Sequence, residues 1–108
     1  MAREVTQEAF KAAWADGALV VDVREADEYA AGHVPGARLM ALRTVSARCG
    51  ELPTDRPVFV ICASGNRSRT ATDQMNSRGI DAYSVAGGTS AWARAGRPVA
   101  AGSHEHAA

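Results

Sequence analysis

Cys62 is the side chain in this sequence best placed for nucleophilic chemistry. It follows the apolar run Val58–Ile61, which predicts a buried strand, and it precedes a predicted helix over residues 67–78. Ligands of open α/β sheets bind at the carboxyl ends of the strands. The partial positive charge of a helix N-terminus, together with Arg67 and Arg69, lowers a thiol pKa and favours the thiolate. The pattern therefore predicts a reactive cysteine.

The loop after this cysteine is suited to surround an anion. Gly65 permits a positive φ, and Ala63 and Ser64 add little bulk, so successive backbone N–H groups can converge on the sulfur. A cysteine at the end of an apolar strand is also typical of a small buried hydrophobe. Position alone leaves both interpretations open, and the composition of the loop favours the nucleophile.

Two polar side chains earlier in the chain are candidates for structural support. Asp22 lies in the apolar run 18–23, where a carboxylate needs a cation, and Arg24 and Arg67 are the candidates to pair with it. Structural pairing is favoured over catalysis. His33 stands before Val-Pro-Gly and is predicted to be a turn residue bonded to backbone, with a general base as the alternative.

The remaining thiol and imidazoles carry little functional signal. Cys49 is predicted to be a bystander thiol, with a resolving partner for Cys62 as the alternative. One disulfide is possible on count, but without an export signal free thiols are favoured. His104 and His106 alternate in the C-terminal tail, and two imidazoles without a third ligand do not predict a metal site.

Strands and helices alternate along the chain. Strands are predicted over residues 3–5, 18–23, 39–42, 58–61 and 83–86. Helices are predicted over residues 6–15, 24–31, 44–52, 67–78 and 87–96. This alternation predicts an α/β fold with a parallel sheet covered by helices on both faces.

The predicted helix over residues 67–78 has an unusual inward face. It carries only Ala71 and Met75 on an apolar stripe, and its other possible core positions, Ser68, Thr72 and Gly79, are small. This composition predicts a helix that packs close to the sheet.

Length, charge and hydropathy limit the classes of protein. The chain has 108 residues, enough for one core, and we expect one domain over residues 1–100 and a frayed tail over residues 101–108. A formal net charge of zero does not favour nucleic acid or a membrane surface as a partner. No stretch approaches the roughly 20 apolar residues of a membrane span. The first residues lack the apolar core of a secretory signal, so a cytoplasmic location is expected.

Five stretches together resemble the rhodanese family of sulfurtransferases. They are V-V-D-V-R-E from Val20, E-Y-A-A-G-H-V-P-G-A from Glu28, C-A-S-G-N-R-S from Cys62, V-A-G-G-T-S-A-W from Val85 and A-G-R-P-V from Ala95. In this order they cover nearly the whole chain. The resemblance implies a single rhodanese-like domain with a mostly parallel sheet of about five strands.

The resemblance also implies roles around Cys62, the sulfur-carrying nucleophile. The substrate- and persulfide-binding loop then consists of Ala63, Ser64, Gly65, Asn66, Arg67 and Ser68. Arg67 and Arg69 are candidates to attract an anionic donor, and Arg67 is also a candidate to anchor the loop through Asp22. No metal or organic cofactor is implied.

The implied reaction is a double displacement. Sulfane sulfur passes from a small donor such as thiosulfate to Cys62, and the persulfide passes it to a thiol or cyanide acceptor. A sulfur carrier between proteins is the alternative, with a sulfur-relay protein as partner. Related phosphatases and arsenate reductases place five residues between cysteine and arginine, whereas four separate Cys62 from Arg67 here, which favours sulfur. A non-catalytic domain is disfavoured because the cysteine and its loop are intact.

Overall fold

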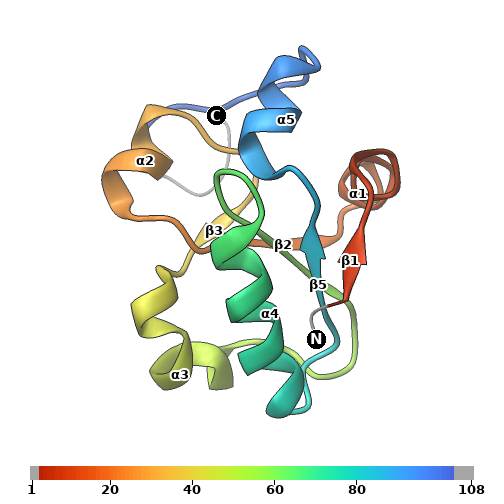
Figure 1. Ribbon diagram of the computed structural model, residues 1–108, viewed down its shortest axis with the longest axis vertical. Coiled ribbons are helices and arrows are strands. Elements are labelled where there is room, and N and C mark those ends of the chain that lie inside the picture. The colour runs from red at the N-terminus through yellow and green to blue at the C-terminus, as the bar shows by residue number, and fades with distance from the viewer. Residues whose placement is uncertain (1–2, 104–108) are drawn as a thin grey trace.

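A parallel sheet forms the centre of the protein. The computed structural model describes residues 3–103, and within them five strands pair in the order β1-β5-β4-β2-β3, each neighbouring pair parallel. The strands are β1 (Glu4–Val5), β2 (Leu19–Asp22), β3 (Arg38–Leu39), β4 (Val58–Ile61) and β5 (Ala82–Val85). The helices are α1 (Gln7–Ala15), α2 (Ala26–Ala31), α3 (Val45–Arg48), α4 (Asn66–Ser77) and α5 (Gly88–Arg94), seen in Figure 1. The predicted α/β fold is confirmed.

β4 lies in the middle of the sheet, between β5 and β2. All four of its residues are buried, as the unbroken apolar run predicts. Val58 and Val60 belong to one hydrophobic cluster and Phe59 and Ile61 to the other, because successive side chains of a strand point to opposite faces. Cys62 is next in this alternation and lies in the cluster of Val58 and Val60.

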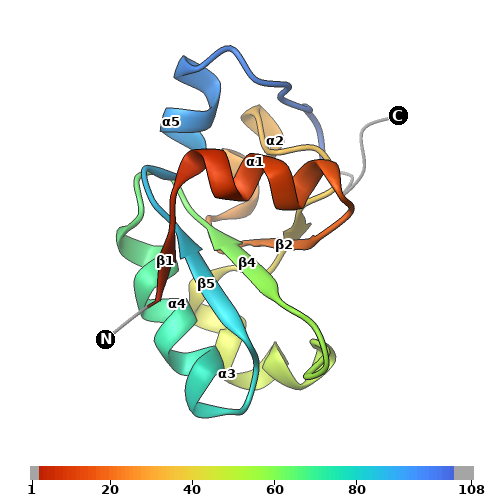
Figure 2. The same ribbon diagram turned by 90° about the vertical axis from the view of Figure 1, so that its right-hand side faces the viewer.

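Helices cover both faces of the sheet, as Figure 2 shows with α1 in front of the strands and α3 and α4 behind them. Val45 of α3 and Met75 of α4 pack into the cluster on one face. Phe10 of α1, Tyr29 of α2 and Trp92 of α5 pack into the cluster on the other. The two clusters are the two halves of one α/β core.

Local sequence explains the two longest helices. Thr6 caps α1 by accepting a hydrogen bond from the Ala9 N–H at 3.1 Å. α4 buries Ser68, Ala71, Thr72 and Met75, so two of its core-facing side chains are small hydroxyl residues, as its composition predicts. α4 therefore lies directly against β4 and β5.

Several predicted boundaries are wrong. β3 begins one residue earlier than predicted and ends at Leu39. The predicted helix over residues 44–52 is divided into the 3-10 turns Leu42–Thr44 and Cys49–Glu51 with α3 between them. Thr44 Oγ1 donates to the Ala41 carbonyl at 2.7 Å, and such a local bond competes with a regular helix. α2 starts two residues late because Glu25 forms a capping box with Glu28.

The chain remains attached beyond the predicted end of the domain. His33 and Ala100 form an antiparallel bridge, with both N–H···O distances at 2.8 Å. The Gly102 N–H also donates to the Ala30 carbonyl at 2.8 Å, so the attached segment continues two residues past the predicted boundary at residue 100. Residues 104–108, with His104 and His106, lie outside the described residues. Within residues 3–103, the helices are all too short or too polar to cross a bilayer.

Candidate active site

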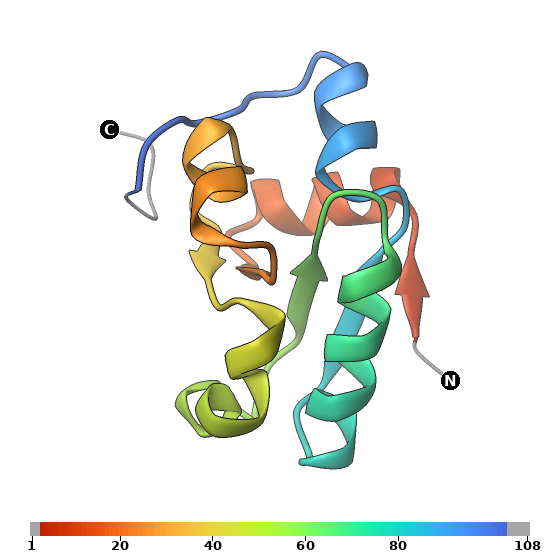
Figure 3. The ribbon, with the colours of Figure 1, turned by 60° about the vertical axis from the view of Figure 1, so that its left-hand side comes forward.

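Cys62 is placed where the end of β4 meets the start of α4. Figure 3 shows the connecting loop arching between these two elements, with α5 above it. The Cys62 side chain is 1 % exposed. Its side chain points to the face covered by α4, so the sulfur lies against the first turn of that helix. The structure therefore places the predicted nucleophile, Cys62, beside the predicted helix N-terminus.

Hydrogen bonds to the sulfur favour its ionised form. The Gly65 N–H donates to Cys62 Sγ at 3.1 Å, and Ser68 Oγ lies 3.5 Å from it. Burial alone raises the pKa of the Cys62 thiol. Hydrogen bonds from the Ser68 hydroxyl and from the backbone N–H groups of Ser68, Gly65 and Ser64 outweigh burial, so the pKa lies below its ordinary value. This arrangement produces a thiolate more readily than an ordinary cysteine does.

The first turn of α5 orients the loop. The Thr89 N–H donates to the Cys62 carbonyl at 2.8 Å, and the Ser90 N–H donates to the Ala63 carbonyl at 2.9 Å. Each planar trans peptide carries its C=O and the next N–H on opposite sides. Holding the two carbonyls toward α5 therefore turns the N–H groups of Ala63 and Ser64 away from α5. The Ser64 N–H is among the backbone donors that lower the pKa of the Cys62 thiol.

A glycine allows this close approach. A Cβ at Gly88 would lie 2.5 Å from the Cys62 carbonyl oxygen and 2.6 Å from that of Ala63, and Gly88 has a φ of +59°. Both the space and the backbone conformation therefore require glycine. Gln7, the first residue of α1, holds the same turn from the other side by donating to the Ala86 and Gly88 carbonyls at 2.7 and 3.1 Å.

Both arginines predicted to attract an anion have carboxylate partners. Arg67 donates from both Nη atoms to the two Glu28 oxygens at 2.7 and 2.8 Å, so the predicted anchor from Arg67 to Asp22 is wrong. The Arg67 hydrogen bond, with a further one from the Glu25 N–H, lowers the pKa of Glu28 to about 2. Arg69 lies 3.3 Å from a Glu4 oxygen and donates to Asn66 Oδ1 at 2.7 Å.

Asp22 pairs with Arg24, one of its two predicted partners. Asp22 is 0 % and Arg24 7 % exposed. The carboxylate accepts from the Arg24 backbone N–H at 3.0 Å, from Nε at 3.0 Å and from Nη2 at 2.8 Å. Nη2 also donates to the Gly32 carbonyl at 2.8 Å. The pair therefore joins the end of β2 to the end of α2, which is a structural role.

His33 has the contacts of a turn residue. It is 0 % exposed, its ring stacks on that of Tyr29 with centroids 3.7 Å apart, and its Nδ1 lies 2.7 Å from the Tyr29 carbonyl. Within residues 3–103, its Nε2 has no hydrogen-bond partner. These contacts belong to the turn after α2 and leave the alternative of a general base without support.

A family model of the rhodanese-like domain matches residues 6–95. This chain belongs to the rhodanese-like domain family. The thiosulfate sulfurtransferase GlpE of Pseudomonas putida is 40% identical to this chain over 78 residues, which cover 71% of each of the two proteins. The resemblance in the five sequence stretches is thus confirmed at the level of the family.

Solved structures of a rhodanese-related protein and of a rhodanese-like domain protein share this fold. A rhodanese-related protein of Thermoplasma volcanium superposes with a TM-score of 0.84 at 28% identity, covering 90% of this chain and 96% of that one. A rhodanese-like domain protein of Staphylococcus aureus superposes with a TM-score of 0.78 at 29% identity, covering 83% and 90%. The rhodanese-like domain described here is therefore similar to whole proteins of this family.

The structure adds two residues that the sequence did not indicate. Glu28 binds Arg67, and Ser84 of β5 lies 2.7 Å from Ser68 beside the sulfur. A serine in the buried strand Ala82–Val85 was an available signal, because a buried hydroxyl needs a partner.

Cys49 is buried away from the loop, with Arg78 Nη1 3.4 Å from its Sγ, and both cysteines are free thiols.

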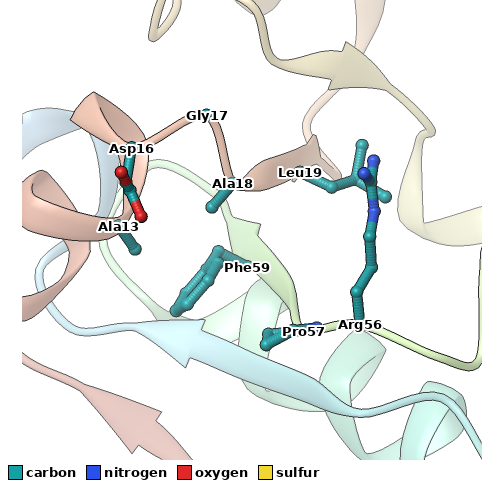
Figure 4. A pocket seen from close by; sticks show the side chains of 8 residues that line it. All are labelled: Ala13, Asp16, Gly17, Ala18, Leu19, Arg56, Pro57 and Phe59. Atoms are coloured by element: carbon teal, nitrogen blue, oxygen red, sulfur yellow. The ribbon is translucent and has the colours of Figure 1, made fainter.

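An apolar pocket of about 290 Å³ lies elsewhere in the rhodanese-like domain (Figure 4). It is lined by the end of α1, by the first residues of β2 and β4 and by the residues just before those strands, including Asp16, Leu19, Arg56 and Phe59. These residues stand at the amino ends of β2 and β4, whereas Cys62 follows the carboxyl end of β4. Within residues 3–103, no group of three or more His, Cys, Asp or Glu side chains is arranged to hold a metal ion.

Proposed function

We propose that this rhodanese-like domain is a sulfurtransferase that carries a sulfane sulfur as a persulfide on Cys62. The observation that carries the proposal is the bond from the Gly65 N–H to Cys62 Sγ at 3.1 Å, at the start of α4, with the thiol pKa lowered. The same donors suit a persulfide anion, whose charge lies on a single terminal sulfur. The name of the Pseudomonas relative supports thiosulfate as the class of donor.

The proposed reaction has two displacements. The Cys62 thiolate attacks the sulfane sulfur of thiosulfate, the sulfur–sulfur bond of thiosulfate breaks, and sulfite leaves with the bonding electrons. The product is a Cys62 persulfide anion. An acceptor thiolate or cyanide then attacks the outer sulfur, and Cys62 leaves as the thiolate. Charge and sulfur balance in both steps, so neither step calls for a metal or an organic cofactor.

A protein-to-protein sulfur carrier is the second candidate, and one observation favours it. Arg67 and Arg69 already bind Glu28 and Glu4, so neither guanidinium is free to attract dianionic thiosulfate. A donor protein would bring its own persulfide to the loop without needing that cation. A carrier should turn over thiosulfate slowly and exchange sulfur quickly with a persulfidated protein.

Intact-protein mass spectrometry after exposure to thiosulfate tests the main proposal. We expect a mass increase of one sulfur atom that cyanide removes with release of thiocyanate. Cys62→Ser should gain no sulfur, and the matched variant Cys49→Ser should gain it as wild type does. Sulfur on Cys49, or hydrolysis of an aryl phosphate that depends on Cys62, would contradict the proposal. Comparing thiosulfate with a persulfidated protein as donor separates the two candidates.

A further inference from the structure

Two buried serine hydroxyls lie beside the Cys62 sulfur. Ser68 Oγ is 3.5 Å from Cys62 Sγ and 2.7 Å from Ser84 Oγ. Ser68 and Ser84 are both 0 % exposed. Ser68 belongs to the first turn of α4 and Ser84 to β5, so the pair connects the helix and the strand next to the nucleophile. Among the hydrogen bonds of residues 3–103, Ser84 reaches Cys62 only through Ser68.

Counting acceptors fixes the direction of the bond between the two hydroxyls. Each serine hydroxyl has one proton and two lone pairs. Ser68 Oγ lies within reach of Cys62 Sγ, the Gly65 carbonyl at 3.1 Å and Ser84 Oγ. Within the described residues, Ser68 Oγ is the only acceptor for the Ser84 hydroxyl. A buried donor without an acceptor is costly, so Ser84 donates to Ser68.

The Ser68 proton then has two alternative acceptors. When Cys62 is a thiol, its S–H donates to Ser68 Oγ, and the Ser68 hydroxyl donates to the Gly65 carbonyl. When Cys62 is a thiolate, the Ser68 hydroxyl rotates and donates to the sulfur, because a bond to a charged acceptor is the stronger one. The Gly65 carbonyl keeps a donor in this state, since the Arg69 N–H lies 3.3 Å from it.

We propose that Ser84 is a positioning residue for the nucleophile, which by donating to Ser68 Oγ keeps the Ser68 proton available to the Cys62 thiolate. A donor at one end of a hydrogen-bonded chain strengthens the next bond in it. The inference deepens the proposed function, on which it rests for the thiolate as attacking group. It concerns the unmodified cysteine, so an experiment without any sulfur donor tests it separately.

The test is the pH dependence of Cys62 alkylation by iodoacetamide, with the Cys62 peptide quantified by mass spectrometry. On the acidic limb of the profile, the rate is proportional to the thiolate fraction. Ser68→Ala removes the donor and should lower this rate by roughly tenfold, equivalent to about 1.4 kcal/mol. Ser84→Ala should lower it by roughly two- to fivefold and move the inflection to higher pH, with the alkaline plateau unchanged.

Two controls separate positioning from loss of structure. Thr72 lies one turn after Ser68 on the same buried face of α4, and within residues 3–103 its hydroxyl has no partner. Thr72→Val therefore removes a matched buried hydroxyl and should keep the wild-type profile. In the Ser68→Ala background, Ser84→Ala should have no further effect, because Ser84 acts through Ser68.

Three results would overturn the inference. They are a Ser84→Ala profile identical to wild type, a shift of its inflection to lower pH, and an effect of equal size in the Ser68→Ala background. Thermal unfolding checks that each variant is folded. If Ser84→Ala is not, Ser84→Cys fills the same space with a weaker donor and should give a shift of the same sign.

Discussion

Glu28 holds Arg67 through two hydrogen bonds of 2.7 and 2.8 Å, although 39 positions separate them in the sequence. Arg67 closes the loop that surrounds Cys62, and its guanidinium is thereby neutralised at the edge of the site. Glu28 also accepts from the Glu25 N–H at 3.0 Å, so one carboxylate both caps α2 and fixes the loop arginine. The consequences of this pair can be measured in two ways.

Replacing Glu28 with Gln should improve the use of thiosulfate. Gln still completes the capping box but leaves Arg67 charged without a counterion, so the guanidinium becomes available to a dianion. Since partly exposed ion pairs contribute about 0–1 kcal/mol, we expect KM for thiosulfate to fall by up to about fivefold with kcat unchanged. The dependence of kcat/KM on salt should become steeper.

The matched control for this change is Glu51→Gln. Glu51 follows α3 in the chain and pairs with Arg48, the last residue of α3, at 3.1 Å, and its replacement by Gln changes the net charge equally. α3 lies at the other end of α4 from the loop that joins β4 to α4 (Figure 1). The control should leave KM and the salt dependence as in wild type. If both variants behave alike, Glu28 has no specific effect on the donor.

The same pair predicts how stability depends on pH. The folded-state pKa of Glu28 is about 2, below its ordinary value of 4.5. A depressed pKa means that folding favours the carboxylate, so this contribution is present above pH 4.5 and is lost as the pH falls toward 2. The difference in Tm between wild type and Glu28→Gln should therefore shrink over this range. A difference that stays constant to the acid end would contradict the pairing.

Asp22→Ala should strongly destabilise the fold. It leaves the buried Arg24 guanidinium with the Gly32 carbonyl but without its carboxylate. Removing one partner of a buried pair costs about 3–5 kcal/mol in the free energy of unfolding, which urea denaturation measures. Asp81→Ala breaks the exposed pair with Arg3 and should cost about 0–1 kcal/mol. Equal losses would show that the Asp22–Arg24 pair is not effectively buried.

Gly88→Ala should displace the loop that surrounds the sulfur. The new Cβ would lie 2.5 Å from the Cys62 carbonyl oxygen, so the bonds from α5 to the loop cannot keep their lengths. We expect at least roughly tenfold slower sulfur transfer and a loss of about 1–3 kcal/mol in stability. Gly96→Ala is the control, because Gly96 has a φ of +75° and nothing within 4 Å of its Cβ position. It should lose stability through backbone strain alone and keep its activity.

The fold could be predicted where the information is local. The apolar run of β4 and the small inward face of α4, including Ser68 and Thr72, specify elements that pack in one way. The pattern over residues 44–52 predicts one helix, whereas the structure divides this segment into two 3-10 turns with α3 between them. Boundaries of this kind depend on tertiary packing.

In the candidate site, too, the local features could be predicted from the sequence and the contacts between distant residues could not. Cys62 and its loop are contiguous in sequence, and their types and order were enough to place them. The partners of the charged groups could not be predicted, because Arg67 could pair with any of several carboxylates. Only the packing of α2 against the loop selects Glu28. A serine in a buried strand indicates that its hydroxyl needs a partner, but only the packing of β5 beside α4 identifies Ser68 as the partner of Ser84.

Because side chains alternate along β4, the number of residues in this strand decides on which face of the sheet the Cys62 side chain lies. Val58, Val60 and Cys62 face α4, while Phe59 and Ile61 face the other layer. Deleting one residue between Val58 and Cys62 would reverse the face of Cys62 relative to that of Val58. The thiol would then emerge on the wrong side of the sheet, away from the donors of the loop, even if a strand still formed. We therefore expect β4 to tolerate substitution by another apolar residue but not the insertion or deletion of a residue.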